Sequence, residues 1–547
     1  MIERIIIPGP PGTGKTHRLV WKYLIKEIQE YKTPMKKIGF FTFTRTASKV
    51  AKERIIQAVP NLDWNKDLEH VSTLNALGTR ECGIDTSTQL LKGRKWDAFK
   101  NKYGGVVSKL NFETFATPDG IVHYSNEYIK LINLARYRKI SLENQYLLKE
   151  HTQDISYKTL TYINDCLIQF KETSTMFEFI DQISEFIKKF DEAKEKNKEF
   201  IKFDALFLDE AQDLNNLQWE MFHRLESKAK RSYIAGDDDQ AIMGFQGANS
   251  AHFIRLHSDK NTKVDKGLSR SRRCPAIVVK VGKYILGQIP KGKRIEKNWF
   301  PRMKNGKVVP GELEFVPDFK MIDFSKGKFL IQTRTNKMLE PVKDFLEDKG
   351  FYYSSKKGNS LINQDMLTAI DTCSKLKMNE LVPVKLCMKM YNYMSVNKPK
   401  NIKRGFKNCN SLRAIEEESI SIKDLREKHG LLAEGPWEKW FDKFTDKQRE
   451  YIKTLISNNE DVSPTSKARI RLSTIHGAKG DEDENIVHFL ELGDVSYDSF
   501  RKNPIPEHNL QLVGVSRAIN KLYLVTSASS ATYPLTKRDI EEYECIQ

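Results

Sequence analysis

Apolar and polar positions follow two different rhythms along the chain. Over residues 1–75, and again from Phe203, short apolar runs typical of buried strands alternate with amphipathic helical stretches. Between about 80 and 200 the strand pattern disappears and long polar helices take its place. In the first stretch, strands are predicted over 3–8, 37–43 and 69–72 and helices over 15–30 and 46–58. Residues 80–200 are therefore predicted to be a mainly helical insertion into an α/β domain.

The same alternation returns in the second half. An α/β block begins near residue 265, turns helical and basic after about 370, and regains strand patterns after 467. The simplest organisation is two α/β domains, each interrupted by a helical insertion. The predicted boundaries are 1–79 with 201–264 for the first domain, 80–200 for its insertion, 265–370 with 467–547 for the second domain, and 371–466 for its insertion.

The first predicted strand leads into a glycine-rich loop. GPPGTGKT, at residues 9–16, has the spacing of a P-loop between a strand and a helix. In such a loop, backbone N–H groups surround phosphates, the lysine reaches the β and γ oxygens, and the hydroxyl after it ligates Mg²⁺. The helix directs its positive end at the same anions. The predicted nucleotide-binding residues are Gly9, Pro10, Pro11, Gly12, Thr13, Gly14, Lys15 and Thr16.

Two further apolar strands end in polar groups. FDALFL (203–208) is followed by Asp209 and Glu210, and the strand over 232–235 is followed by Gly236, three aspartates and Gln240. If these strands are neighbours in a parallel sheet, their polar groups lie at the same carboxyl edge, where α/β folds bind ligands. A metal-binding carboxylate, a carboxylate base and an amide around one phosphate would form the sensing half of a nucleotide-driven motor.

Composition excludes several classes of protein. None of the 547 residues lies in an apolar run of about 18, so no membrane span is expected. The first strand begins near the N-terminus, which leaves no room for a leader. The seven cysteines form no C-x-x-C pair and are expected to be reduced thiols. The expected location is the cytoplasm of a prokaryote or of a virus or phage host, or the nucleus in a eukaryote.

The net charge of +18, from 90 Lys and Arg against 72 Asp and Glu, favours a polyanionic partner. A lysine-rich composition without such a partner is the alternative. Residues 291–307 carry seven basic residues against one acid, with Trp299 and Phe300 between them, and 374–407 is similar. Such segments could line a single-strand groove or be solvated helix faces, and both interpretations stay open.

The motifs, taken together, resemble superfamily 1 helicases of the UvrD/Rep/PcrA type. Eight segments in the family's order cover nearly the whole chain: GPPGTGKT, FTFTRTASKVAKERI (41–55), VSTLNALG (71–78), LDEAQD, GDDDQAIMGFQGA, LSRSRRCPAIV (268–278), RLSTIHGAKGDEDENIV (471–487) and LVGVSRAINKLYLV (512–525). The resemblance implies an α/β fold of two RecA-like P-loop domains, whose parallel sheets are flanked by helices and which each carry a mainly helical insertion.

The resemblance also implies roles at the nucleotide. ATP would lie between the two lobes, with Thr16 and Asp209 holding Mg²⁺. Glu210 is the candidate base for the attacking water, and Gln240 would contact the γ-phosphate or that water. The other implied residues are Lys15, the arginine fingers Arg273 and Arg517 from the second lobe, Glu482 toward the ribose, and His17 and Arg272 beside the nucleotide.

Three positions match residues that touch nucleic acid in the family or link it to ATP, and two threonines are further candidates. Phe43, Phe245 and His476 would contact the strand, and Thr44 and Thr73 could bind phosphates. Aromatic stacking tolerates any base, which suits a translocase. A buried core role is the alternative for Phe43 and Phe245.

The chain departs from the family pattern around the base of the nucleotide. Only eight residues precede Gly9, so the upstream glutamine that reads adenine is missing. Arg272 stands where a tyrosine usually stacks on the base, and His17 stands where arginine is usual. Met243, Phe245 and Gln246 replace the usual tyrosine, tryptophan and arginine.

These features predict an ATP-dependent DNA helicase or translocase that couples hydrolysis to movement on single-stranded DNA and to duplex unwinding. Its partners would be single strands and single-strand/duplex junctions, and its cofactors ATP and Mg²⁺. The 3′–5′ polarity is implied only by the resemblance. An RNA-directed helicase, a translocase that displaces proteins, and a P-loop regulatory ATPase or loader are the alternatives.

Overall fold

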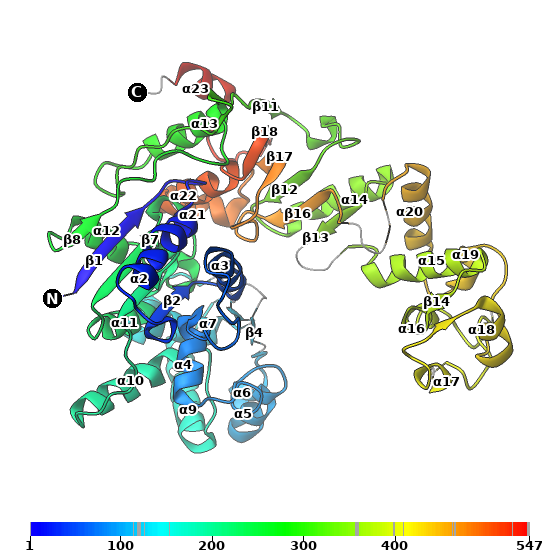
Figure 1. The fold of residues 1–547 in the computed structure, drawn as a ribbon, viewed down its shortest axis with the longest axis horizontal. Helices are drawn as coiled ribbons and strands as arrows, with labels where there is room; N and C mark the ends of the chain where they lie inside the picture. Colours follow the sequence, from blue (N-terminus) through cyan, green and yellow to red (C-terminus); the bar gives the residue numbers. More distant parts are fainter. Residues whose placement is uncertain are drawn as a thin grey trace. The chain divides into compact units, whose positions relative to one another are not determined.

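The chain forms two compact units, which are described separately. The computed structural model describes residues 2–112, 114–116, 122–124, 126–151, 154–355, 360–397, 400–407, 410–461, 463, 467–527 and 529–543. Unit 1 comprises Met1–Pro310, Phe500–Ser516 and Tyr543–Gln547, and unit 2 comprises Gly311–Ser499 and Arg517–Glu542 (Figure 1). Among the described residues, no helix combines the length and apolarity that a membrane crossing requires.

Unit 1 is built on a six-stranded parallel sheet in the order β3-β2-β6-β7-β1-β8. Its strands are β1 (Glu3–Pro8), β2 (Ile38–Thr42), β3 (Val71–Thr73), β6 (Ala205–Leu208), β7 (Arg231–Gly236) and β8 (Thr262–Val264). Successive strand residues enter different cores: Ile6 packs in one and Ile7 in the other. Both faces are covered, which explains the continuous apolar runs in the sequence.

Helices cover both faces of this sheet. The predicted helix over 15–30 is present as three consecutive segments, with a π-helical turn in the middle. The helices around the sheet are α1 (Lys15–Arg18), the π segment η1 (Leu19–Leu24), α2 (Ile25–Gln29), α3 (Arg45–Ala58), α4 (Leu74–Cys82), α11 (Asn216–Glu226) and α12 (Ala251–Ser258). Unit 1 also contains α13 (Ala276–Gly287) and α22 (Ile505–Val515).

The region over 80–200 is mainly helical. It contains α5 (Lys95–Tyr103), α6 (Gly105–Ser108), α7 (Glu127–Arg138), α8 (Leu142–Leu147), α9 (Tyr157–Ser174) and α10 (Asp181–Glu195), with a small hairpin of β4 (Thr114–Ala116) and β5 (Val122–Tyr124). Helices α5, α7 and α9 enclose a separate core around Trp96, Phe99 and Leu160. The predicted helical insertion is therefore present.

Unit 2 also contains a six-stranded parallel sheet, in the order β11-β18-β17-β12-β16-β13. Its strands are β11 (Glu312–Val316), β12 (Phe329–Thr333), β13 (Tyr353–Ser355), β16 (Ile470–Thr474), β17 (Asp483–Phe489) and β18 (Ala518–Val525). Two parallel sheets flanked by helices confirm the predicted α/β fold of two RecA-like domains.

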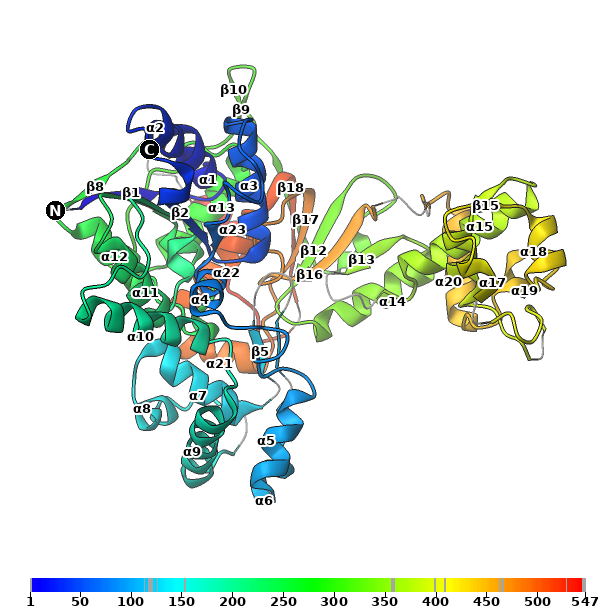
Figure 2. The same ribbon diagram turned by 60° about the horizontal axis from the view of Figure 1, so that its bottom comes forward.

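The insertion of unit 2 is helical as well. Figure 2 shows its helices grouped at one end of the unit. After α14 (Glu340–Lys349) come α15 (Gln364–Lys377), α16 (Val384–Tyr391), α17 (Asn410–Arg413), α18 (Ile422–Lys428), α19 (Trp437–Trp440) and α20 (Asp446–Ser457), with the short strands β14 (Val382–Pro383) and β15 (Ser419–Ile420).

The division into units differs from the predicted boundary at 264/265. Residues 265–310 and the helix α22 belong to unit 1, where α13 and α22 lie side by side (Figures 1 and 2). Gly282 on α13 permits this packing, because a Cβ there would lie 2.3 Å from the Trp299 ring and 3.1 Å from Leu512. The segment is joined to the rest of unit 1 by the Trp299 bond to the Pro11 carbonyl and by the pairing of Arg294 and Lys297 with the aspartates after β7.

Candidate nucleotide and nucleic-acid sites

Three neighbouring strands of unit 1 deliver polar groups to one edge of the sheet. Strand β7 lies between β1 and β6, and Pro8 is in register with Gly236. The Gly9 N–H donates to the Gly236 carbonyl at 3.1 Å, so the P-loop and the aspartate-rich loop leave the sheet together. Asp209 and Glu210 follow β6 at the same edge. The strand neighbours assumed from the sequence are therefore present.

The P-loop surrounds a concave space with backbone groups. Gly12 and Gly14 have φ values of +73° and +87°, which glycine adopts without strain. Lys15 is buried, and its Nζ donates to the Gly9 carbonyl at 3.1 Å. The Thr13 hydroxyl donates to the Pro10 carbonyl at 2.8 Å. These bonds stabilise the curled conformation of the loop, and P-loops of this kind surround phosphates with backbone N–H groups.

Thr16 and Asp209 are in direct contact. The Thr16 hydroxyl donates to Oδ2 of Asp209 at 2.5 Å. Burial, and then the neighbouring Glu210, raise the pKa of Asp209 to about 6, because little water solvates its charge. A hydroxyl and a carboxylate are hard oxygen ligands of the kind that Mg²⁺ prefers. These two residues therefore fit the metal role predicted for them.

An amide that the sequence analysis missed connects the two acidic loops. Gln212 Nε2 donates to Glu210 at 2.5 Å, while Gln212 Oε1 accepts from the Asp237 N–H at 2.9 Å. Glu210 itself has a left-handed backbone, with φ of 57°. Gln240 Nε2 donates to Asp237 at 2.5 Å. The candidate base Glu210 and the candidate sensor Gln240 are thus linked by hydrogen bonds through Gln212 and Asp237. The signal was present in LDEAQD, as an amide two residues beyond the base.

A hollow of about 610 Å³ adjoins the P-loop on the side of His17. The His17 ring stacks on Trp21 at 5.7 Å between centroids. The Arg272 N–H donates to the Gly12 carbonyl at 2.8 Å, and its guanidinium lies against Gly14. Burial and then Arg272 lower the pKa of His17, which favours the neutral ring. His17 and Arg272 thus lie beside the P-loop, and their contact with a nucleotide stays a prediction; Trp21 is a lining residue that the sequence did not indicate.

The two predicted arginine fingers lie in different units. Arg273 was expected from the second lobe, but it belongs to unit 1, where its Cβ lies 3.1 Å from the position that a Cβ on Gly12 would occupy. Arg517 belongs to unit 2, where it is buried and contacts the Asp481 carbonyl. Glu482 and His476 are also in unit 2. Their roles at the nucleotide or the strand stay predictions.

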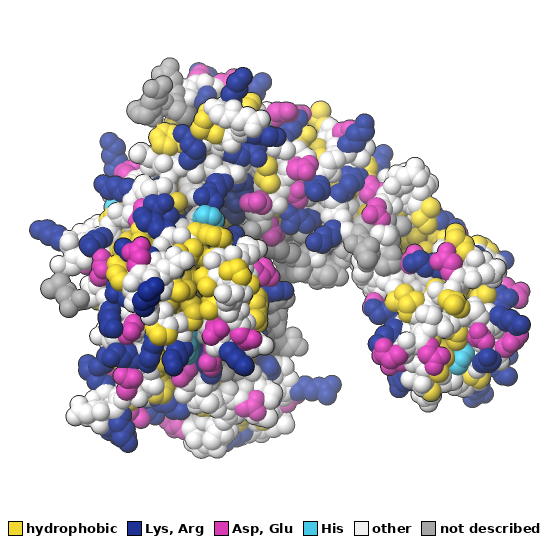
Figure 3. All heavy atoms as spheres, in the orientation of Figure 1, with side chains coloured by type: hydrophobic (Ala, Val, Ile, Leu, Met, Phe, Trp, Pro, Cys, Tyr) yellow, Lys and Arg dark blue, Asp and Glu magenta, His cyan; other side chains and the backbone are white. Residues whose placement is uncertain are grey.

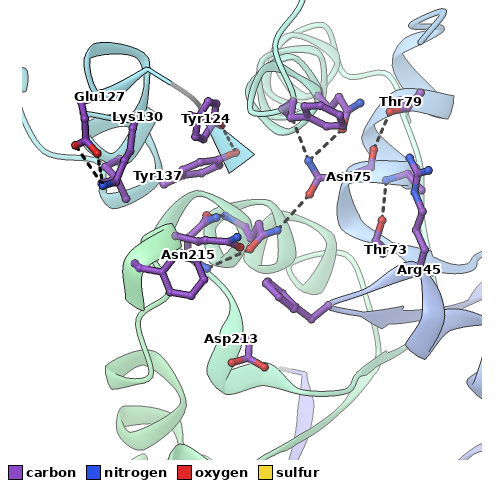
Figure 4. A pocket seen from close by; sticks show the side chains of 18 residues that line it. Arg45, Thr73, Asn75, Thr79, Tyr124, Glu127, Lys130, Tyr137, Asp213 and Asn215 are labelled. Carbon is purple, nitrogen blue, oxygen red and sulfur yellow. Dashed lines mark hydrogen bonds and ion pairs between the residues drawn. The ribbon is translucent and has the colours of Figure 1, made fainter. Parts of the chain in front are cut away.

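A pocket of about 300 Å³ in unit 1 brings together three of the predicted nucleic-acid residues (Figure 4). Phe43 and Phe245 line it with Thr73. Phe245 is 46% exposed, whereas Phe43 is half-buried and also packs against a core. The two rings therefore differ: the core role considered for Phe43 holds in part, whereas Phe245 is the more exposed of the two.

The two threonines have structural roles. Thr73 caps α4 by accepting from the Ala76 N–H at 3.1 Å, and Thr44 caps α3 by accepting from the Ala47 N–H at 3.0 Å. Thr73 lines the pocket and Thr44 does not. Helix capping accounts for both hydroxyls without nucleic acid.

Polar groups that the sequence did not indicate complete the pocket. Tyr124 and Tyr137, from the insertion, face each other with their hydroxyls 3.4 Å apart (Figure 4). Burial raises the pKa of Tyr137 to about 12, so its hydroxyl stays protonated. Asn75 donates to Gln182 at 3.1 Å and accepts from Gln218 at 3.2 Å. The pocket thus combines aromatic rings with hydrogen-bonding groups, which is a composition suited to a nucleobase.

Several residues of the two basic segments have partners within the described part of the protein, and a role of these segments in strand binding stays a prediction. In 291–307, Trp299 is buried and donates to the Pro11 carbonyl at 3.2 Å, and Arg294 and Lys297 pair with aspartates of unit 1. In 374–407, Lys385 and Lys389 form ion pairs with Glu417 and Asp365, and Tyr391 is buried; residues 398 and 399 lie outside the described part. Figure 3 shows Lys and Arg scattered among acids on the face drawn.

The fold and the site together indicate the class of protein. Two RecA-like sheets, a P-loop and a Thr–carboxylate pair are the features of a P-loop nucleoside triphosphatase. Comparison with known proteins then indicates which family of P-loop proteins the chain resembles. Residues 3–261 match the family model for the UvrD/REP helicase N-terminal domain, so this part of the chain is similar to the N-terminal domain of those helicases.

Three curated relatives show the extent of the similarity. The chain is 32% identical over 109 residues to "ATP-dependent DNA helicase Rep" of Buchnera aphidicola subsp. Acyrthosiphon pisum, covering 20% of this chain and 16% of the relative. Rep of Buchnera aphidicola subsp. Baizongia pistaciae is 26% identical over 267 residues, covering 47% and 36%. "ATP-dependent DNA helicase PcrA" of Staphylococcus aureus strain Mu50 is 24% identical over 285 residues, covering 47% and 34%. The chain thus spans about a third of these relatives' length at most.

Proposed function

We propose that this protein is a nucleic-acid-stimulated ATPase that moves along single-stranded DNA and unwinds duplexes ahead of it. The observation that carries the proposal is the meeting of three strand ends, which places Lys15, the Thr16–Asp209 pair and Gln240 at one edge of the unit 1 sheet. The similarity to Rep and PcrA, which are named as ATP-dependent DNA helicases, supports ATP as the nucleotide and DNA as the track.

The residues suggest a division of labour in hydrolysis. Mg²⁺ held by Thr16 and Asp209 would neutralise charge on the phosphates, and Lys15 would add a second positive charge. Glu210, which accepts a hydrogen bond from Gln212, would accept a proton from the attacking water. Gln240 would bind that water or the γ-phosphate. From their places in the motif order, Arg273 and Arg517 would stabilise the transferring phosphoryl group, and Glu482 would bind the ribose.

Two loops offer a route from hydrolysis to the strand. The loop after β6 begins with Asp209 and reaches the pocket at Asp213 and Asn215. The loop after β7 passes Gln240 and reaches the same pocket at Phe245. The loops also bridge each other, because Asn215 pairs with Ala248. Glu210 and Gln240 are each separated by at most five residues from a pocket residue of the same loop. If either side chain moves when the γ-phosphate is lost, the movement can therefore displace pocket residues through a short stretch of backbone.

ATP turnover with and without single-stranded DNA tests this proposal. We expect DNA to stimulate hydrolysis, and we expect a duplex with a 3′ tail to be unwound better than one with a 5′ tail. Stimulation by RNA alone would favour an RNA-directed helicase. Stimulated turnover and strand-bound protein displacement without unwinding would favour a protein-displacing translocase. Turnover that ignores both nucleic acids would favour a regulatory ATPase or loader.

A further inference from the structure

A buried ionic cluster lies directly behind the candidate phosphate sensor. The Nζ of Lys297 is 2.8 Å from Asp237 and 2.9 Å from Asp239, and it also contacts Asp238. The lysine side chain is 4% exposed, and none of the three carboxylates is more than 2% exposed. Charges as deeply buried as these are costly unless they are paired, so this arrangement is a specific feature of the fold.

Three aspartates in succession are a possible metal site, but here their charges are paired with the side chains of Lys297 and Arg294. Lys297 contacts all three, and Arg294 pairs with Asp239 through two bonds of 2.7 Å. The Ile295 N–H donates to Asp238 at 2.7 Å. Although burial alone would lower the pKa of Lys297, the three carboxylates raise it, so the side chain stays charged. The cluster is therefore a closed ion-pair network between residues 294–297 and the loop after β7.

Asp237 connects Lys297 to the candidate sensor Gln240, because it contacts both side chains. One carboxylate oxygen of Asp237 pairs with Lys297, and the other accepts from Gln240 Nε2 at 2.5 Å. This bond fixes the orientation of the amide: its NH₂ faces Asp237, and its carbonyl oxygen faces away. Burial favours a proton on Asp237, but Lys297 and Lys15 together lower its pKa, which keeps it an acceptor. Without Lys297, Asp237 would lose its main counterion and could not hold Gln240 in the same way.

The segment 294–299 also reaches the P-loop. Trp299 Nε1 donates to the Pro11 carbonyl at 3.2 Å, so one six-residue stretch contacts the loop after β7 at one end and the P-loop at the other. A rigid connection between these loops would keep Gln240 in register with the bound phosphates. Rate depends steeply on such placement, and a displacement of about 1 Å can cost about 10²-fold.

We propose that Lys297 is a positioning residue for ATP hydrolysis, which orients Gln240 through Asp237. This inference rests on the proposed function, in which Gln240 binds the attacking water or the γ-phosphate. Lys297 itself touches neither nucleotide nor water in this role. Lys297 pairs with the Asp237 carboxylate, which in turn accepts the hydrogen bond that orients the Gln240 amide.

A double-mutant cycle on the full-length protein tests the proposal. Lys297→Met should lower DNA-stimulated kcat by about 10²-fold and leave the dissociation constant of a fluorescent ATP analogue within about threefold of the wild type, since the P-loop contacts remain. In a Gln240→Ala background, Lys297→Met should have almost no further effect on kcat. Equal losses in both backgrounds would overturn the proposal, because Lys297 would then act without Gln240.

Arg294→Met is the matched control. It removes the other cation of the same cluster, which pairs with Asp239 and Glu296 but not with Asp237. We expect kcat to stay within about threefold of the wild type, because the contact between Asp237 and Gln240 is retained. A loss equal to that of Lys297→Met would overturn the proposal, since general charge imbalance would then explain both.

Asp237→Asn carries the same test if Lys297→Met does not fold. Lys297 keeps Asp238 and Asp239, and only the carboxylate that holds Gln240 is changed. Non-additivity with Gln240→Ala is again expected, and full additivity overturns the proposal. A wild type that hydrolyses ATP normally while both cycles are additive would leave the proposed function intact. A wild type without turnover would overturn the proposed function and this inference together.

Discussion

The two ends of the loops after β6 and β7 differ in how they are built. At the sheet edge, Asp209 and Asp237 are buried, and short hydrogen bonds fix their positions. At the pocket, Phe245 is 46% exposed, and the wall opposite comes from the insertion through Tyr124 and Tyr137. The first end is rigid and charged, whereas the second is aromatic and more open. Chemistry on phosphate needs fixed charges, and a moving strand needs contacts that release.

Removing the P-loop cation should have the largest effect at the rigid end. Lys15→Ala removes the positive charge from the phosphate oxygens, and we expect kcat for ATP to fall by about 10³-fold. The affinity for a fluorescent single strand, measured by anisotropy, should stay near the wild-type value because Lys15 does not line the pocket. Loss of DNA binding in this variant would mean that the two ends are not separate sites.

Gln212→Ala should have a smaller effect at the same end. Glu210 would lose the amide that holds it, and we expect kcat to fall by between about 10- and 100-fold, with little change in nucleotide affinity. Gln218→Ala is the control, because Gln218 bonds Asn75 and the Asn215 N–H but neither Glu210 nor Asp237. Similar losses of basal turnover in both variants would contradict the role given to Gln212.

Phe245→Ala probes the open end. Stacking on one aromatic ring contributes about 1–3 kcal/mol, so the dissociation constant for a single strand should rise by roughly tenfold. Turnover without DNA should be unchanged. Phe300→Ala is the matched control, since Phe300 is similarly exposed but does not line the pocket. An equal loss of affinity at Phe300 would return residues 291–307 to consideration as a DNA contact.

The base of the nucleotide should matter least. Among the described residues that line the hollow beside His17 are several cations and hydroxyls, but no Asn, Gln, Asp or Glu. The lining hydroxyls can accept from the amino group of either base, and guanine adds the N7 and O6 acceptors that arginine can bind. We therefore expect kcat/KM for GTP to lie within about tenfold, or about 1.4 kcal/mol, of that for ATP. A preference for ATP above about 10³-fold would show that another group reads the base.

The same contrast explains what the sequence could predict. Asp209, Glu210 and Gln240 were predictable because each follows an apolar strand, and parallel strands bring such ends together. Tyr124 and Tyr137 were not, because the insertion carries no spaced motif and they become neighbours only by folding. Trp299 was misleading for a related reason: a basic and aromatic composition does not reveal partners near residues 11 and 237.

Some expected placements also depended on packing alone. Arg273 was expected from the second lobe, but its segment lies in unit 1, where Trp299 bonds Pro11 and Lys297 pairs with Asp237. Nothing in the local pattern of residues 265–310 indicates this, because α13 is apolar enough to cover either sheet. The alternating pattern predicted the existence of the two sheets, but the assignment of residues 265–310 to unit 1 required the structure.

Steady-state ATP hydrolysis, measured over a titration of single-stranded DNA, tests the central claim most directly. If the two loops connect the phosphate to the pocket, the wild type should be stimulated by DNA, and Phe245→Ala should need roughly tenfold more DNA for the same stimulation while keeping its basal rate. A wild type whose turnover is the same at every DNA concentration would contradict the account.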